Sequence, residues 1–166
     1  MCIKQADYYL ECCHAILTVE NMDAWQRQVE KAVEILQKGS VVAFPTDTVY
    51  GLGADAFNAP AEARIYEIKK RPRHQQFLVL IGEIKQLTTL AKSIPEFARF
   101  LAKRFWSGGL SLVLSKADLV PAHLAAEATI ALCIPNYPVC LALIKSLGNP
   151  IIKHQRQYQR PTICFN

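Results

Sequence analysis

The sequence predicts a single-domain α/β fold, because short apolar runs alternate along the chain with amphipathic segments of helical period. The chain has 166 residues, of which 51% are hydrophobic and 20% charged, so it can close one sizeable core. No internal repeat and no low-complexity linker divides it. Alternating strands and helices are typical of a sheet covered by helices, and some antiparallel pairing is compatible with the loop-rich residues 115–128.

The first elements follow from periodicity and from capping residues. Apolar residues recur at Val29, Ala32, Val33 and Leu36, with Gly39 as a stop signal, which predicts a helix from residue 23. The remaining expected elements, in chain order, are a strand at 41–44, a loop at 46–54, a helix at 61–70, a strand at 77–81, helices at 84–91 and 95–105, strands at 110–114 and 129–134, and a helix at 138–147.

Composition excludes several classes of protein. No apolar run approaches the ~20 residues of a membrane span, and Asp7 and Glu11 stand where a signal peptide would be apolar, so we expect a cytoplasmic protein without membrane partners. The six cysteines form no CxxC pair, so neither a metal site nor a disulfide framework is predicted. A net charge of +5 favours anionic partners such as nucleotides or RNA.

The loop after the predicted strand at 41–44 contains the densest group of candidate ligand-binding side chains. Thr46, Thr48 and Tyr50 supply three hydroxyl groups immediately after a buried strand, and Asp47 adds a carboxylate. Ligands of open α/β sheets collect at the carboxyl ends of strands, so this loop is well placed to hold a small polar ligand. The same residue types also populate ordinary turns, and composition alone leaves both interpretations open.

A dense group of cations follows the next predicted helix. Lys69, Lys70 and Arg71 precede Pro72, which ends the helix. Cations at a helix C-terminus complement the helix dipole, but several together suit a polyphosphate. Neither GxxxxGK[ST] nor GxGxxG occurs, so any nucleotide is held without a P-loop or a Rossmann turn.

Four segments carry a family resemblance, namely residues 42–55 (VAFPTDTVYGLGAD), 65–80 (IYEIKKRPRHQQFLVL), 105–114 (FWSGGLSLVL) and 130–139 (IALCIPNYPV). In this order they resemble the YrdC family, the bacterial threonylcarbamoyl-AMP synthases. The resemblance divides the chain into a poorly patterned leader at 1–20, a YrdC-like domain at 21–152 that is incomplete at its C-terminus, and a tail at 153–166 outside the family pattern.

The resemblance implies a twisted mixed sheet with a basic concave face, and a nucleotidyltransferase activity. The family condenses L-threonine, bicarbonate and ATP, with Mg²⁺, into threonylcarbamoyl-adenylate and pyrophosphate, and partner proteins then modify tRNA. Carried over by motif, Thr46, Thr48 and Tyr50 would bind threonine. Lys69, Arg71 and Ser111 would bind ATP. No residue is assigned as catalytic acid or base, because placing the nucleophile and neutralising pyrophosphate suffice.

The sequence departs from the family in several motifs. Cys133 stands where the family has arginine. A thiol cannot donate a charged, forked hydrogen bond to the substrate carboxylate, so binding of that carboxylate is weakened unless neighbouring cations compensate for the lost arginine. Gln76 replaces a usual proline, and Trp106 is followed by Ser-Gly-Gly in place of Pro-Gly-Pro.

The tail KHQRQYQRPTICFN replaces a Ser-x-Ser-Ala-Asn-x-Ser-Gly segment of the family. A back-translation of the tail, read one nucleotide later, encodes Ser-Thr-Ser-Ala-Asn-Ile-Ser-Gly. We therefore interpret residues 153–166 as a frameshift product, and a genuine basic tail that binds RNA is the alternative.

Three functions remain open from the sequence. The first is a threonylcarbamoyl-AMP synthase, impaired by Cys133 and the altered tail. The second is a YrdC-like module that binds double-stranded RNA or tRNA without catalysis, and the third is an inactive pseudogene product. Coupled binding of ATP and threonine distinguishes the first from the others.

Overall fold

The structure, a computed structural model, describes residues 15–17, 22–47, 50–70, 72, 74–125 and 128–155. Within these residues a mixed sheet has the strand order β1-β2-β3-β7-β4-β6-β5, with parallel pairing of β1 with β2 and of β4 with β6. The predicted α/β class with a mixed sheet is confirmed. The strands are β1 (Ala15–Ile16), β2 (Val42–Phe44), β3 (Gly51–Asp55), β4 (Leu78–Leu80), β5 (Leu112–Ser115), β6 (Thr129–Cys133) and β7 (Ile151–Gln155).

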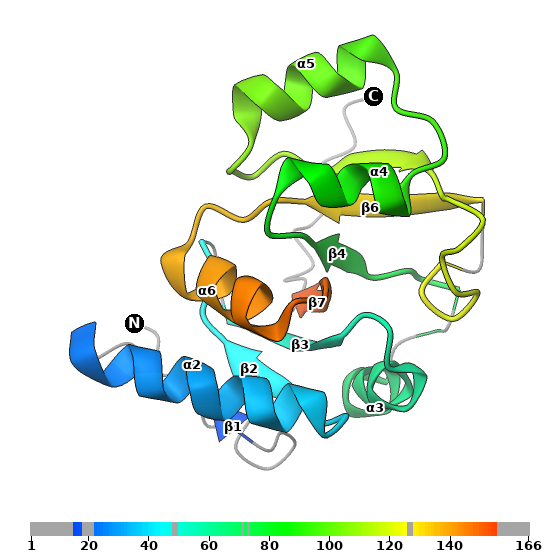
Figure 1. Ribbon diagram of the computed structural model, residues 1–166. Coiled ribbons are helices and arrows are strands. Elements are labelled where there is room, and N and C mark those ends of the chain that lie inside the picture. The colour runs from blue at the N-terminus through cyan, green and yellow to red at the C-terminus, as the bar shows by residue number, and fades with distance from the viewer. Residues whose placement is uncertain are drawn as a thin grey trace, which may run out of the picture.

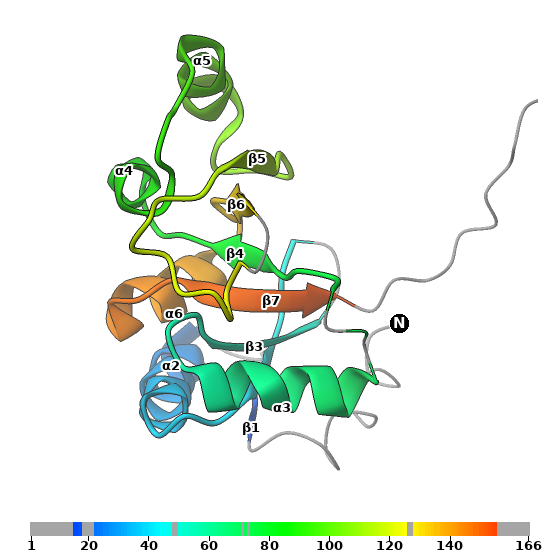
Figure 2. The ribbon, with the colours of Figure 1, turned by 90° about the vertical axis from the view of Figure 1, so that its right-hand side faces the viewer.

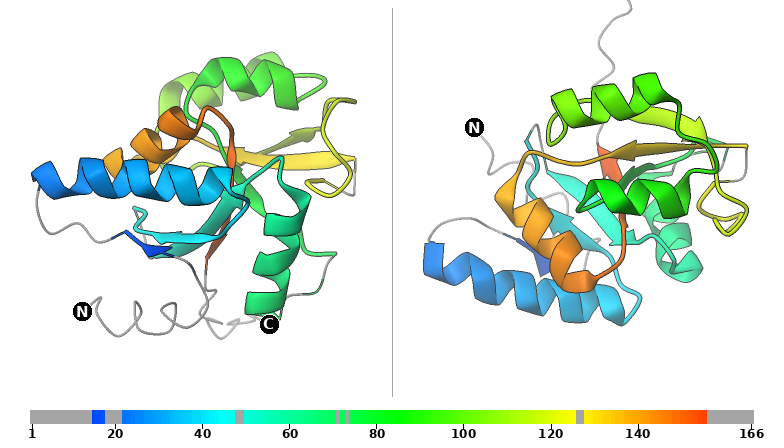
Figure 3. Two further views of the ribbon diagram at one scale, coloured as in Figure 1. Left: turned by 60° about the horizontal axis from the view of Figure 1, so that its bottom comes forward. Right: turned by 45° about the horizontal axis from the view of Figure 1, so that its top comes forward.

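The helices cover the sheet in two groups (Figures 1 and 3). They are α2 (Met22–Gln37), α3 (Ala59–Lys69), α4 (Leu87–Leu90) with the preceding 3₁₀ turn η1 (Ile84–Gln86), α5 (Glu96–Phe105) and α6 (Pro138–Leu147). Helices α2 and α6 lie side by side and share one apolar cluster, while α3, α4 and α5 contribute to the other. No helix of the described residues is long and apolar enough to cross a membrane.

Capping residues set the helix ends, and Gly39 is the stop that the sequence predicts. Gly39 follows α2 with a φ of +74°, and Gly148 follows α6 with a φ of +80°. Asn58 begins α3 because its side-chain oxygen accepts a hydrogen bond of 2.9 Å from the backbone N–H of Ala61. Lys70 ends α3 in the left-handed region, with a φ of 47°. The chain therefore turns sharply at Lys70, directly after the last residue of α3.

The predicted loop at 46–54 is wrong in its second half. Residues 51–55 form β3, which pairs with β2 on one side and with β7 on the other. Leu52 and Ala54 are fully buried there. The two glycines of this strand resemble loop residues in the sequence, but a sheet accepts glycine where a neighbouring side chain approaches closely.

Two further strands lie in segments for which no strand was predicted. In the predicted leader, β1 pairs with β2 and Leu17 is buried. At the other end, β7 continues to Gln155, so the domain boundary predicted at residue 152 falls inside a strand of the sheet. Residues 156–166 lie outside the described residues, and the frameshift interpretation stays a prediction.

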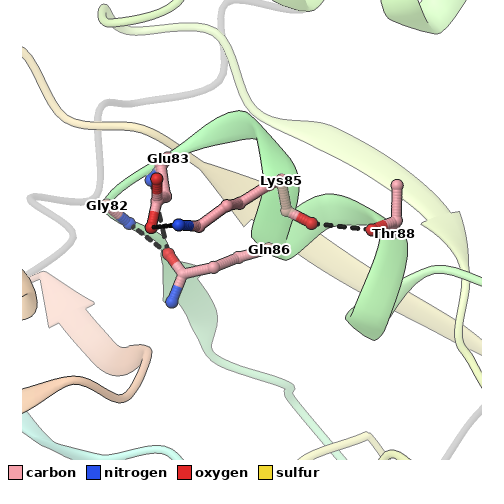
Figure 4. A network of polar contacts seen from close by, with 5 residues as sticks. All are labelled: Gly82, Glu83, Lys85, Gln86 and Thr88. Carbon is pink, nitrogen blue, oxygen red and sulfur yellow. Dashed lines mark hydrogen bonds and ion pairs between the residues drawn. The ribbon is translucent and has the colours of Figure 1, made fainter.

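A polar network fixes the turn that follows β4 (Figure 4). The Gln86 side-chain oxygen accepts hydrogen bonds from the backbone N–H groups of Gly82, at 2.7 Å, and Glu83, at 3.3 Å. A pocket of about 280 Å³ lies here and is also lined by Ile144, Lys145 and Gly148. Gly82 follows closely on Leu80, the last residue of β4, whereas the strand begins at Leu78. The pocket therefore lies at the end of the sheet where β4 finishes, away from the end where it starts.

We expect Gly53→Ala to destabilise the fold by about 1–3 kcal/mol, because overpacking a dense core forces side chains and backbone to shift. A Cβ atom at Gly53 would collide with Phe44 Cε1 and lie 2.9 Å from Ile151 Cγ2. Urea denaturation measures the loss. Gly109→Ala is the matched control, since nothing lies within 4 Å of its added Cβ, and equal losses in the two variants would contradict the assignment.

Candidate functional site

Four strands and one helix bring their ends together at one end of the sheet. Phe44, the last residue of β2, pairs with Gly51, and Gly51 pairs with Gln155 at the end of β7. The first residue of β4, Leu78, pairs with Lys153. Helix α3 runs back from the far end of β3, so its C-terminal end lies here too (Figure 2). The structure thus places the loop with Thr46 and the cationic end of α3 at the same end of the sheet.

The threonine-binding residues predicted from the sequence occupy the loop between β2 and β3. Thr46 is buried, and its hydroxyl oxygen accepts a hydrogen bond of 3.1 Å from Lys153 Nζ. Tyr50 is half-buried and packs against the apolar cluster shared with α3. Thr48 lies outside the described residues. Its role therefore stays a prediction.

Lys153 is the residue of this site that the sequence analysis did not identify. It lies in the middle of β7, opposite Gly53 on β3, and only 6% of it is exposed. Its Cγ and Cε lie 3.3 and 3.4 Å from the position that a Cβ of Gly51 would take. A glycine at position 51 therefore gives this long side chain room to cross β3 toward Thr46.

The electrostatics around Lys153 are unusual for a lysine. Burial lowers the pKa of Lys153, while Asp47, Cys140 and Cys133 act in the opposite direction. Asp47 is exposed, and the ion pairs among the described residues do not include Lys153. The ammonium group is therefore held mainly by a neutral hydroxyl rather than by a carboxylate.

The charge of this lysine acts on two buried thiols, Cys133 and Cys140. Cys140 Sγ donates to the carbonyl oxygen of Pro45 at 3.1 Å, and Cys133 Sγ donates to that of Gly108 at 3.3 Å. Burial raises the pKa of Cys133 to about 11 and that of Cys140 to about 12, while Lys153 lowers both. Both thiols are neutral at pH 7, and they are not nucleophiles in this site.

The nucleotide-binding residues predicted from the sequence are described in part. Lys69 is half-buried in the last turn of α3, and Ser111 is exposed just before β5. A hydrogen bond between Ser111 and the Cys133 thiol lowers the pKa of that thiol, so Ser111 lies beside it. Arg71 lies outside the described residues. Hydrogen bonds thus join Thr46 to Lys153 and Ser111 to Cys133, and the charge of Lys153 acts on the Cys133 thiol.

An aromatic pair holds the chain that leaves α3. The Tyr66 hydroxyl donates to the carbonyl oxygen of Gln75 at 3.0 Å, and its ring lies 4.4 Å from that of Phe77. Phe77 in turn meets His154 of β7 edge-on at 5.8 Å. These contacts tie the segment with the cations to the same strand that carries Lys153.

Metal-binding groups are sparse in this part of the molecule. The described residues contain no cluster of three or more His, Cys, Asp or Glu side chains that could hold a metal ion. A magnesium ion that arrives with a nucleotide needs only one or two protein carboxylates, because phosphate and water supply its other ligands. Asp47 is an exposed carboxylate of this loop, and its chemistry fits that role.

A mixed sheet covered by helices, with a hydroxyl-bearing loop and the lysines of the end of α3 at one end of it, defines an α/β protein that gathers polar and cationic side chains at that end. The chain belongs to the Sua5/YciO/YrdC family, whose model, described as "Telomere recombination", matches residues 34–154. This match contains every residue proposed for the site, including Lys153.

Similarity to individual proteins supports the family assignment. The chain is 47% identical over 126 residues to a threonylcarbamoyl-AMP synthase of Bacillus subtilis and 42% identical over 133 residues to one of Pyrococcus abyssi. The crystal structure of P. abyssi Sua5 complexed with L-threonine superposes with a TM-score of 0.75, at 39% identity, over 84% of this chain and 40% of that one.

These relatives are longer proteins. The matches span 75% and 80% of this chain but only 36% and 38% of the B. subtilis and P. abyssi proteins. The similarity therefore concerns the domain described above.

We expect Lys153→Met to be more stable than the wild-type chain at pH 7, by about 1–3 kcal/mol, because it removes a poorly paired buried charge. Burial lowers the pKa of Lys153 below its ordinary 10.5, so the unfolded chain binds more protons between these two values. The wild type gains stability as pH rises through that window, and its deficit relative to the variant shrinks.

Chemical denaturation from pH 7 to 10.5 measures this difference. The variant Lys145→Met is the control, since Lys145 is an exposed lysine in the last turn of α6. A gap between wild type and Lys153→Met that stays constant with pH would show that Lys153 titrates normally.

Proposed function

We propose that this chain forms L-threonylcarbamoyladenylate and pyrophosphate from L-threonine, bicarbonate and ATP. The observation that carries the proposal is that the family match includes both the loop that begins after β2 with Thr46 and the end of α3, which lie at the same end of the sheet. The names of the relatives and the L-threonine complex of Sua5 support it.

The proposed division of labour rests on the family motifs and is supported by the positions of Thr46, Tyr50, Lys69 and Ser111. Thr46, Thr48 and Tyr50 hold threonine between β2 and β3. Lys69 and Arg71 hold the phosphates of ATP at the end of α3, and Ser111 lies toward the nucleotide. Since Ser111 contacts Cys133, which lies near Lys153, the two ligands are held by groups that adjoin one another.

The chemistry needs little covalent work from side chains. Threonine and bicarbonate condense to a carbamate with loss of water, and a carbamate oxygen then attacks the α-phosphorus of ATP. The bond from that phosphorus to the bridging oxygen breaks, and pyrophosphate leaves with the electron pair. Cations neutralise the leaving group and alignment supplies the rate, so no general base is assigned. Mg²⁺ bound with ATP adds charge neutralisation at the phosphates.

We further propose that the product serves tRNA threonylcarbamoyladenosine modification in the cytoplasm, through partner proteins that transfer the threonylcarbamoyl group. The net charge of +5 suits a protein that works close to RNA.

Pyrophosphate release tests the proposed activity. We expect release that requires ATP, threonine and bicarbonate together, with a coupled phosphate assay as the measurement. Omitting threonine or bicarbonate is the control for simple ATP hydrolysis. Binding of tRNA without any such release would favour an RNA-binding module instead.

We expect Lys69→Ala to weaken ATP binding roughly ten- to a hundredfold, since a hydrogen bond to a charged group contributes about 1.5–3 kcal/mol. Threonine affinity and the thermal midpoint should change little, because Lys69 lies at a helix end. Calorimetric titration measures both affinities. Lys103→Ala is the control, at an exposed lysine in the last turn of α5, and equal ATP affinity in the two variants would contradict the assignment.

A further inference from the structure

Lys153 has hydrogen-bonding capacity that the protein does not use. An ammonium group carries three N–H donors. One is donated to Thr46 Oγ1 at 3.1 Å, and the described residues offer Lys153 no other hydrogen bond and no ion pair. The bond to Thr46 fixes the position of Nζ and leaves two donors.

The titratable groups whose charge acts on this nitrogen come from three parts of the fold. Asp47 follows β2, Cys133 ends β6 and Cys140 lies in the first turn of α6. Both thiols are neutral at pH 7, and Asp47 is exposed to solvent. The surroundings therefore do not balance a positive charge inside the molecule.

A buried charge is costly unless it is paired. The cost is removed either by loss of the proton or by an anion that accepts the remaining N–H groups. Thr46 belongs to the loop assigned to the amino acid, so the anion that comes closest to Lys153 in the proposed reaction is the carboxylate of that substrate. The nucleotide phosphates lie with the cations at the end of α3.

We propose that Lys153 is a specificity-determining residue that binds the α-carboxylate of the amino acid substrate, alongside Thr46. The inference rests on the proposed function, and it concerns this chain as it stands, with Lys153 in β7, whichever reading frame encodes residues 153–166. Lys153 also supplies a cation whose charge acts on the Cys133 thiol, and that neutral thiol cannot itself pair with a carboxylate. Lys153 thereby selects amino acids over their uncharged analogues.

The test compares L-threonine with L-threoninol, in which a hydroxymethyl group replaces the carboxylate. Titrations use the full chain with the ATP analogue AMPCPP present, and measure wild type, Lys153→Met and the control Lys145→Met. We expect wild type and Lys145→Met to bind threonine at least tenfold more tightly than threoninol. Lys153→Met should lose this preference by weakening threonine alone, with AMPCPP affinity unchanged.

A second measurement separates charge pairing from a structural role. Binding of a carboxylate raises the pKa of Lys153, so binding of threonine to the wild type should be accompanied by proton uptake at a pH above the lowered pKa of the free protein and below 10.5. Titrations in two buffers of different ionisation enthalpy measure this uptake, which Lys153→Met should lack. Thermal melting checks that the variant is folded.

The outcomes distinguish the inference from the proposed function. An unchanged or tighter threonine affinity in Lys153→Met would overturn the inference, and a tighter one would mean that the side chain obstructs the pocket. Wild-type binding with the expected preference but without pyrophosphate release would support Lys153 and reject adenylation. A wild type that neither binds threonine nor releases pyrophosphate rejects both.

Discussion

The pairing of β7 with both β3 and β4 is the constraint on which the architecture depends. Without this strand, the half of the sheet that contains β1, β2 and β3 would share no strand pairing with the half that contains β4, β5 and β6. The pairing joins residues about a hundred positions apart, such as Gly53 and Lys153. Its register also sets the site, because it turns Lys153 toward Thr46 and His154 toward Phe77.

Close packing against glycine makes this register possible. Gly53 leaves space for Phe44 and Ile151, and Gly51 leaves space for the stem of Lys153. A long cationic side chain can therefore lie within the sheet and present its charge beside a hydroxyl. The resulting charge is poorly balanced, which destabilises the domain alone but favours an anionic ligand. Residues that bind ligands are often those that weaken the empty fold.

Whether a helix or strand could be predicted from the sequence depends on particular residues. The helix that begins near Asp23 and the one that begins at Pro138 were predictable, because apolar period and a terminal glycine are local signals. Strand β3 was missed because Gly51 and Gly53 resemble loop residues until neighbours are known. Strand β7 was missed because a lysine-bearing segment after a family motif resembled a tail. The loop that holds Thr46 and Tyr50 could be located, since hydroxyl groups after a buried strand are visible in sequence, while the binding roles of these residues stay a prediction.

The sequence by itself determined the α/β class, the family, and the hydroxyl and cationic segments, because periodicity and motifs are encoded over neighbouring residues. Only the tertiary structure decided that β7 lies at the centre of the sheet and that Lys153 meets Thr46. That contact depends on strand order and register, which arise from pairing between distant segments. A buried lysine and a solvated one look the same along the chain, and burial is what distinguishes their chemistry.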